Sequence, residues 1–121
     1  MRAAYIDSRR FLRYSFTMTT DTSLDRALHA IADPTRRRIL QALKQARHET
    51  RSAGANPGTG ACLCGGEIEE RIHLSQPTIS HHMAILTKAG LVEATKQGQW
   101  RWYRRNEKAI RQVVKALKGK L

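Results

Sequence analysis

Two cysteines separated by a single residue are the side chains of this sequence best suited to chemistry. Cys62 and Cys64 are the only cysteines among the 121 residues. Thiolates select soft ions, so the pair is a candidate site for a thiophilic metal or metalloid. In a cytosolic setting the alternative is a pair of reduced thiols with a structural or redox role.

Enzymatic chemistry has no comparable signal. The sequence contains no glycine-rich phosphate loop, no nucleophile motif and no carboxylate pair at a spacing suited to acid-base catalysis. His81 and His82 are adjacent, and adjacent side chains on a helix cannot both face one ion. We therefore expect a binding protein that requires no cofactor, rather than an enzyme.

Residues 74–88 have the pattern of a DNA-recognition helix. A serine hydroxyl at Ser75 can cap its start, and Pro77 is tolerated this early in a helix. At about 100° per residue, the apolar residues Ile79, Met83 and Leu86 share one side. The first turns then expose side chains suited to base edges or phosphates, namely Ser75, Gln76, Thr78, Ser80 and His81. An ordinary amphipathic surface helix is the alternative.

A β-hairpin is predicted after this helix. Strands at Leu91–Lys96 and Gln99–Arg104 flank a two-residue loop, Gln97–Gly98, where glycine supplies a positive φ. Alternation places the two tryptophans on one face, where packing is their usual role. The candidates near the hairpin tip for contacting phosphate or the minor groove are Lys96, Gln99 and Arg101.

The net charge of +12 implies a polyanionic partner. Double-stranded DNA is the first candidate. A basic architectural or RNA-binding protein is the alternative, and it would show no preference for a palindromic sequence. No apolar run approaches the roughly 20 residues that span a bilayer, so we expect a cytoplasmic protein without a membrane partner.

The remaining helices complete a helix-turn-helix. A first helix ends before Asp33, which caps a second helix that starts at Pro34 and continues to about Ala46. Residues 47–60 are predicted to be a long loop because they are rich in Gly, Ser, Thr, Asn and Pro. A short third helix, at about 66–73, leads through a tight turn into the recognition helix. The consecutive arginines 36, 37 and 38 spread around the second helix, so we expect them to face solvent or phosphate.

These segments resemble the ArsR/SmtB family of winged-helix transcriptional repressors between about Leu24 and Leu117. Residues 27–40 are similar to the family's LADPTRLRIL opening, and residues 74–92 to its LSQPTVSHHLKLLREAGLV recognition segment. Residues 98–103 are similar to its wing. The resemblance implies a mainly α fold with a β-hairpin wing, a winged helix-turn-helix. The implied function is sequence-specific regulation of transcription, with repression at a palindromic DNA operator.

The C-terminal residues are predicted to form a last helix, capped by Asn106, with an apolar stripe. In the family the terminal helices pair across a two-fold axis, so the resemblance implies a homodimer. Packing of the stripe within one chain is the alternative. The expected interface residues are Leu24, Leu28, Ile110, Val113, Val114 and Leu117.

The resemblance also gives the cysteines a role. Arsenic and soft-metal sensors of the family carry a Cys-x-Cys pair at the start of the third helix, so arsenite or another thiophilic ion is a candidate inducer. Here Gly65 and Gly66 follow the pair, which places the thiols in the loop ahead of that helix. With no third cysteine, His48, His73, a neighbouring chain or an exogenous thiol would complete the ligand set. A redox inducer, another inducer or no inducer are the alternatives.

The first 20 residues are predicted to be a flexible basic extension. They contain four arginines, no lysine and one acid in no helical or strand pattern, and Met18 resembles a natural start. Residues 21–121 are expected to form one domain for both DNA binding and dimerisation.

Overall fold

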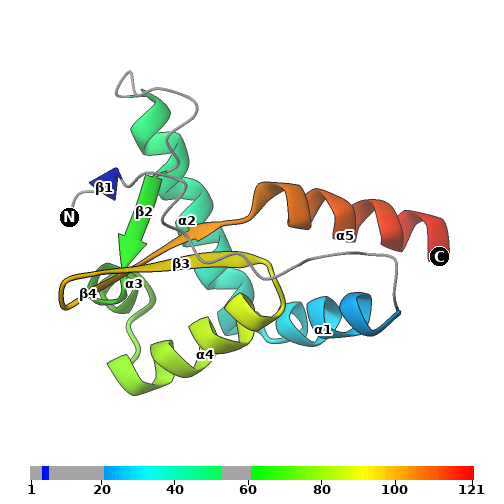
Figure 1. Cartoon of the computed structure of the whole chain (residues 1–121), viewed down its shortest axis with the longest axis horizontal. Coiled ribbons are helices and arrows are strands. Elements are labelled where there is room, and N and C mark those ends of the chain that lie inside the picture. Colours follow the sequence, from blue (N-terminus) through cyan, green and yellow to red (C-terminus); the bar gives the residue numbers. More distant parts are fainter. Residues whose placement is uncertain (1–3, 6–20, 53–60) are drawn as a thin grey trace.

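The computed structural model describes residues 4–5, 21–52 and 61–121. In chain order the elements are β1 (Ala4–Tyr5), α1 (Asp21–Ala32), α2 (Pro34–Ser52), β2 (Ala61–Cys64), α3 (Gly65–Ile72), α4 (Gln76–Lys88), β3 (Val92–Gln97), β4 (Trp100–Arg105) and α5 (Glu107–Lys120). Figure 1 shows α3 and α4 joined by a short turn, with the β3–β4 hairpin beside α4 and α5 projecting from the end of β4. This mainly helical arrangement with an antiparallel hairpin is the predicted winged helix-turn-helix.

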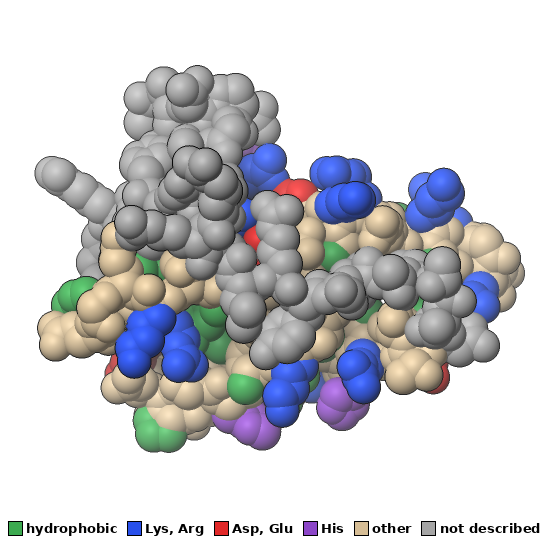
Figure 2. All heavy atoms as spheres, viewed as in Figure 1, with side chains coloured by type: hydrophobic (Ala, Val, Ile, Leu, Met, Phe, Trp, Pro, Cys, Tyr) green, Lys and Arg blue, Asp and Glu red, His purple; other side chains and the backbone are tan. Residues whose placement is uncertain are grey.

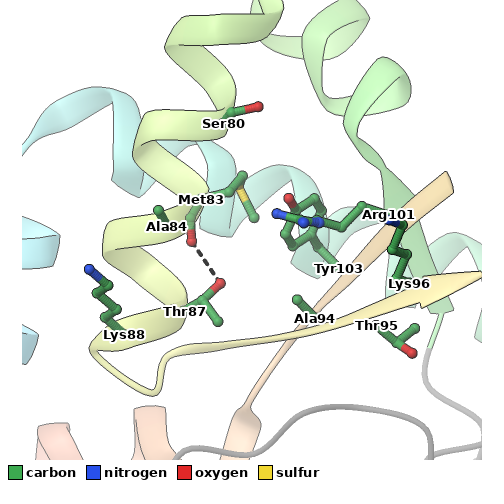
Figure 3. Close-up of a pocket in the computed structure, with 10 residues that line it drawn as sticks. All are labelled: Ser80, Met83, Ala84, Thr87, Lys88, Ala94, Thr95, Lys96, Arg101 and Tyr103. Atoms are coloured by element: carbon green, nitrogen blue, oxygen red, sulfur yellow. Dashed lines mark hydrogen bonds between the residues drawn. The ribbon is translucent and has the colours of Figure 1, made fainter. Parts of the chain in front are cut away.

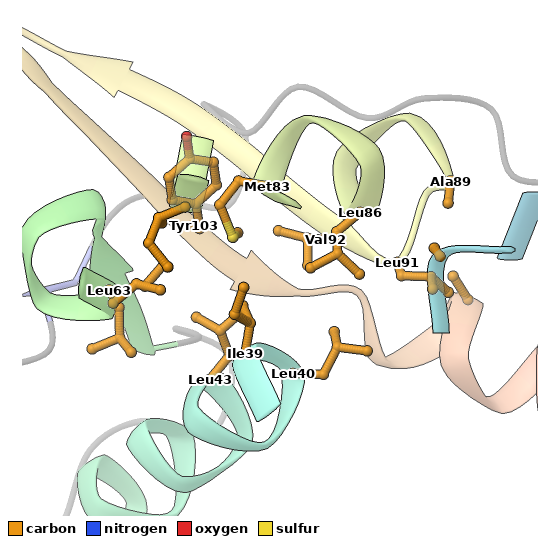
Figure 4. Packing of buried hydrophobic residues seen from close by; sticks show 14 of the residues in the cluster. Ile39, Leu40, Leu43, Leu63, Met83, Leu86, Ala89, Leu91, Val92 and Tyr103 are labelled. Carbon is orange, nitrogen blue, oxygen red and sulfur yellow. The ribbon is translucent and has the colours of Figure 1, made fainter. Parts of the chain in front are cut away.

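The hydrophobic core lies where α2, α4 and the sheet meet (Figure 4). Ile39 and Leu43 from α2 pack against Met83 and Leu86 from α4, and Tyr103 closes the cluster from β4. The predicted inner face of α4 is confirmed, since its three apolar residues are at most 1 % exposed. Burial of this apolar face fixes the rotation of α4 and leaves its other side in solvent.

Side-chain caps start two of the helices as predicted. The Asp33 carboxylate accepts from the backbone N–H of Arg36 at 3.1 Å, and the Asn106 side chain accepts from Ala109 at 3.1 Å. The predicted cap at Ser75 is wrong in detail. Its hydroxyl instead lies 3.0 Å from the hydroxyl of Thr78, and it makes no capping bond to the backbone.

The wing hairpin pairs one residue further along than predicted. Gln97 lies opposite Trp100, so the loop is Gly98–Gln99 rather than Gln97–Gly98. Gly98 has a φ of 61°, which confirms that the tip needs glycine. A positive φ at the first loop position matches the right-handed twist of paired strands.

The second helix is longer than predicted. It continues past Ala46 to Ser52, over polar residues that the composition assigned to a loop. Tertiary ion pairs support this extra length, because Arg47 lies 3.1 Å from Glu107 of α5 and Glu49 lies 3.3 Å from Arg71 of α3. The rest of the predicted loop, residues 53–60, lies outside the described part of the chain.

A strand absent from the prediction carries both cysteines. The sheet order is β1-β2-β4-β3, and Leu63 and Cys64 of β2 lie opposite Tyr103 and Trp102 of the wing. The expectation that the thiols lie in a loop is therefore wrong, and α3 begins one residue earlier than expected, at Gly65. Ala4–Tyr5, predicted to be flexible, form β1 at the outer edge of β2, while residues 1–3 and 6–20 lie outside the described residues.

Over the described residues, no helix has both the length and the apolar content needed to cross a membrane.

Candidate nucleic-acid interface

The predicted DNA-contacting residues all lie on the surface. Five of them occupy the turn before α4 and its first two turns, and three lie in the wing. All eight are exposed, namely Ser75, Gln76, Thr78, Ser80, His81, Lys96, Gln99 and Arg101. Figure 2 shows Lys, Arg and His side chains along the edge of the molecule formed by the wing, α4 and α1. The structure thus brings the predicted contacts of the recognition helix and the wing onto two neighbouring protrusions.

The turn before α4 fixes how the helix is presented. His73 ends α3 in the left-handed region with a φ of 63°, and its backbone N–H closes the helix on the carbonyl of Glu69 at 2.8 Å. Such a residue reverses the chain within a short turn. The exposed N-terminal end of α4 therefore leads, as in helices that enter the major groove.

A hollow of about 510 Å³ separates α4 from the wing (Figure 3). Lys88 lines it from the end of α4, and Lys96 and Arg101 line it from the wing. Lys96 and Arg101 are direct cross-strand neighbours. None of the ten lining residues is acidic.

The sequence predicted that Arg36 faces solvent or phosphate, and this prediction is wrong. It is 7 % exposed and donates to the carbonyl oxygens of Ala30 at 2.6 Å and His29 at 3.1 Å. One guanidinium nitrogen also lies 3.2 Å from Nδ1 of His82 on α4. Arg36 therefore links the end of α1 to the recognition helix. Its place three residues after the cap Asp33 is the sequence signal that could have revealed it.

The two histidines of α4 have different surroundings. His81 is exposed, whereas His82 is half-buried. Burial lowers the pKa of His82, and the charge of Arg36 lowers it further against the opposing effect of Asp33. A neutral ring with an unprotonated Nδ1 accepts the Arg36 donor.

The two thiols are reduced and buried on one face of β2. Cys62 packs with Trp102, while Cys64 lies at the start of α3. Burial raises the pKa of the Cys64 thiol, and the Glu67 carboxylate raises it further, whereas backbone N–H groups of Gly66 and Glu67 oppose the rise. Within the described residues, no group of three or more His, Cys, Asp or Glu side chains is placed to hold a metal ion.

Glu67 is a feature of this region that sequence reasoning missed. Its side chain is 3 % exposed, and its Oε2 has no hydrogen-bond partner among the described residues. Its position three residues after Cys64 placed it on the inner side of α3, so helical periodicity could have found it.

The predicted interface stripe is only partly available to another chain. Leu24 and Val113 are 6 % and 4 % exposed within a single chain, so they pack inside it. Val114 is 48 % exposed, and Leu28, Ile110 and Leu117 are half-buried. Only these last four residues are candidates for contact with a second copy.

Comparison with known proteins identifies the family. The sequence profile described as bacterial regulatory protein, arsR family, matches residues 60–94, which cover β2 to the start of β3. The transcriptional repressor SdpR of Bacillus subtilis is 31 % identical over 91 residues, which are 75 % of this chain and 84 % of that protein.

Two solved structures share the fold. A possible transcriptional regulator for arsenical resistance superposes with a TM-score of 0.59 at 27 % identity, over 76 % of this chain and 80 % of that one. A homodimeric winged helix-turn-helix DNA-binding domain of Mycobacterium bovis gives a TM-score of 0.59 at 21 % identity, over 86 % and 89 % of the two chains. The chain therefore belongs to the arsR family of bacterial regulatory proteins, which are DNA-binding transcriptional regulators and not enzymes.

Proposed function

We propose that this protein represses transcription by binding a palindromic DNA operator as a homodimer. The observation that carries the proposal is the exposed polar start of α4, held beside a basic wing by a buried apolar face. Hydroxyl, amide and imidazole groups at that end match the donors and acceptors of the major groove. The name of SdpR, a repressor, supports the direction of regulation, and the homodimeric domain of M. bovis supports the assembly.

Selection of duplexes from a random-sequence library by the purified protein tests this function. The expected result is an imperfect palindrome bound at least about 10³-fold more tightly than random duplex, with affinity falling steeply as salt rises. Equal affinity for selected and random duplexes would refute the repressor and favour an architectural protein.

Within the complex, α4 and the wing should have separable roles. Gln76→Ala or Ser80→Ala should relax base preference by about 1–3 kcal/mol at one position of each half-site. Lys96→Ala should weaken all sequences alike, because phosphates carry no sequence information. A changed base preference in the wing variant alone would reverse this assignment.

We further propose that a thiophilic ion such as arsenite releases the DNA by binding at Cys62 and Cys64. The arsenical-resistance regulator of similar fold supports this inducer class. Both thiols share one face of β2. Glu67 lies in the first turn of α3, which follows Cys64 directly, and its buried Oε2 has no hydrogen-bond partner among the described residues.

The distance between Cys62 and Cys64 along β2 suggests how ion binding could release the DNA. Alternate residues of a strand lie about 6.6 Å apart, whereas thiolates at about 2.3 Å from one ion lie within about 4.6 Å of each other. A ligand that joins both sulfurs must therefore turn the two side chains toward each other and disturb the packing of Cys62 on Trp102, a residue of the wing strand β4 that pairs with β2. A typical coupling of about 1–3 kcal/mol would lower operator affinity roughly 5- to 150-fold.

Titration of the operator complex with arsenite, antimonite and cadmium under reducing conditions tests the inducer. The double variant Cys62→Ser, Cys64→Ser should bind the operator normally and fail to respond. No change in wild-type affinity with any of these ions would exclude the pair as the sensor. Release by mild oxidation alone would favour a redox inducer instead.

A further inference from the structure

The hollow between α4 and the wing has the chemistry of an anion site. Its wall carries the cations Lys88, Lys96 and Arg101 together with the hydroxyl groups of Ser80 and Tyr103, and its floor includes the apolar side chain of Met83 (Figure 3). Its volume of about 510 Å³ is within the range of sites that hold small organic groups. Cations over an apolar floor suit a sugar–phosphate unit.

Two of these cations face each other without a compensating acid in the hollow. Lys96 and Arg101 lie directly opposite on β3 and β4. Like charges at such a pair destabilise a hairpin in isolation. An anion bound between them would reverse the sign of this interaction, so the pair itself points to an anionic ligand.

Arg101 is held toward the hollow by its neighbour two residues along β4. The Arg101 guanidinium lies beside the Tyr103 phenol (Figure 3), and its presence opposes the rise in the Tyr103 pKa that burial causes. Tyr103 is only 6 % exposed and belongs to the hydrophobic core, so packing holds its hydroxyl in one position. The remaining donors of Arg101 are left for a ligand.

The position of the hollow identifies the anion. If α4 enters a major groove and the wing reaches the adjacent minor groove, one DNA strand must cross the space between them. That space is the hollow. Every nucleotide of the strand carries one phosphate, and a guanidinium binds phosphate through two parallel hydrogen bonds.

We propose that the hollow seats one phosphodiester of the operator strand that crosses from the major to the minor groove. Arg101 and Lys96 bind its oxygens, and Tyr103 acts as the positioning residue that aims Arg101. The proposal rests on the proposed DNA-binding function, and it assigns Arg101 to the backbone rather than to the floor of the minor groove. It also gives the core residue Tyr103 a role in binding.

Methylphosphonate scanning of the selected palindrome tests the seat. Each duplex replaces one phosphate per half-site with a neutral linkage, and affinity is measured for the wild type, Arg101→Gln, Tyr103→Phe and Lys115→Gln. Lys115 is an exposed cation on α5 and serves as the matched control. We expect one linkage per half-site to cost the wild type at least about tenfold in affinity.

The same linkage should cost Arg101→Gln almost nothing, since the two changes remove one interaction. Tyr103→Phe keeps the ring and should lose about two- to tenfold in affinity, with a reduced penalty at that linkage and an unchanged melting temperature. Lys115→Gln should show the full wild-type penalty. Additive penalties for Arg101→Gln at every linkage would overturn the seat, and wild-type behaviour of Tyr103→Phe would overturn its positioning role.

Salt dependence on random duplex separates this inference from the function it rests on. A backbone contact is independent of sequence, so Arg101→Gln should reduce the slope of log affinity against log salt by about 1 per subunit on random duplex as well. Failure to select any palindrome, with this reduction present, would refute operator recognition and retain the phosphate seat. A selected palindrome, with a salt slope that Arg101→Gln leaves unchanged, would retain operator recognition and refute the phosphate seat.

Discussion

Arg36 connects two parts of the molecule that sequence alone leaves separate. The last turn of a helix leaves carbonyl groups without intrahelical partners, and Arg36 satisfies two of them at the end of α1, on His29 and Ala30. The same guanidinium reaches His82 on α4. Arg36 thus adds a polar link between the end of α1 and the recognition helix, whose rotation is fixed by its buried apolar face.

Arg36→Met should destabilise the fold by about 1–3 kcal/mol. Methionine has a similar length but leaves the two carbonyl groups and His82 Nδ1 without their donor in a buried place. Arg38→Met is the matched control, because Arg38 is exposed and makes only a long 3.5 Å contact to the carbonyl of Ile72. Urea unfolding of both variants checks this. Equal midpoints for the two variants would contradict the role of Arg36.

Protonation of His82 should weaken the fold in acid. Its pKa is lowered below the ordinary 6.5 by burial and by Arg36, so the unfolded chain binds the proton first as the pH falls. The stabilising contribution of the neutral ring is therefore present above about pH 6.5 and is lost as the pH falls below it. Groups facing the ring are Asp33, Arg36 and His81.

Urea unfolding of the wild type and His82→Asn at pH 7.5 and pH 5.5 measures this contribution. Asparagine keeps a hydrogen-bond acceptor and does not titrate, so this variant should lose less stability between the two pH values. His81→Asn, on the exposed neighbour, should lose as much as the wild type. If His82→Asn and the wild type lose equal stability, protonation occurs elsewhere.

At the scale of elements, local signals were sufficient where side chains determine their own structure. Asp33 and Asn106 cap helices as predicted, and the apolar residues of α4 face inward as periodicity requires. The predicted ends of β3 and β4 differ from the observed ones by a single residue. Each of these features depends on residues within a few positions of one another.

Features that depend on distant residues were not predictable in this way. Strand β2 has only four residues, and it pairs with β4, about forty positions along the chain. The last turns of α2 are polar, and they gain their partners from α3 and α5. Arg36 was predicted to face solvent or phosphate, and Glu67 was not singled out. Their positions on the helices carry a signal, but the partners that accommodate a buried charge are identified only once the neighbouring elements are placed.

The wing tip gives a prediction that distinguishes backbone strain from side-chain crowding. A Cβ at Gly98 would meet no atom within 4 Å, yet the φ of 61° is costly for any other residue. Gly98→Ala should therefore destabilise the hairpin by about 1–2 kcal/mol. Gly119→Ala, in the last turn of α5 with equally open space, should be neutral or stabilising by up to about 1 kcal/mol.

Melting temperature and operator affinity measured together test the wing. Gly98→Ala should lower both, since a displaced hairpin moves Lys96 and Arg101 away from the DNA, whereas Gly119→Ala should lower neither. A destabilised Gly98→Ala protein with full DNA affinity would show that the wing takes no part in binding.

At the scale of the whole molecule, α5 offers a surface for the proposed second copy. The helix projects from the body beside α1 (Figure 1), and its apolar stripe is only half covered within one chain. Val113 faces inward and is buried in the core, while Val114 on the same stripe is 48 % exposed. An apolar stripe that is left in water at the end of a domain is a candidate contact for an identical copy.

Val114→Asp should therefore produce a folded monomer with weak operator binding. The side chain is exposed in a single chain, so aspartate costs the protomer little, but at a two-fold interface it would place two unpaired charges in an apolar contact. One subunit then holds one half-site, and loss of the second set of phosphate contacts should lower affinity for the full palindrome far more than for an isolated half-site.

Lys115→Asp is the matched control, because residue 115 lies on the opposite side of α5 from the stripe and takes the same acidic side chain. Light scattering should give the monomer mass for Val114→Asp and twice that mass for Lys115→Asp, with circular dichroism unchanged for both. A dimer mass in Val114→Asp would place the interface away from α5. The wild type could instead have the monomer mass at the concentrations where it binds the palindrome. The two subunits would then assemble on the DNA itself, and the same pair of variants would test the α5 stripe in the complex.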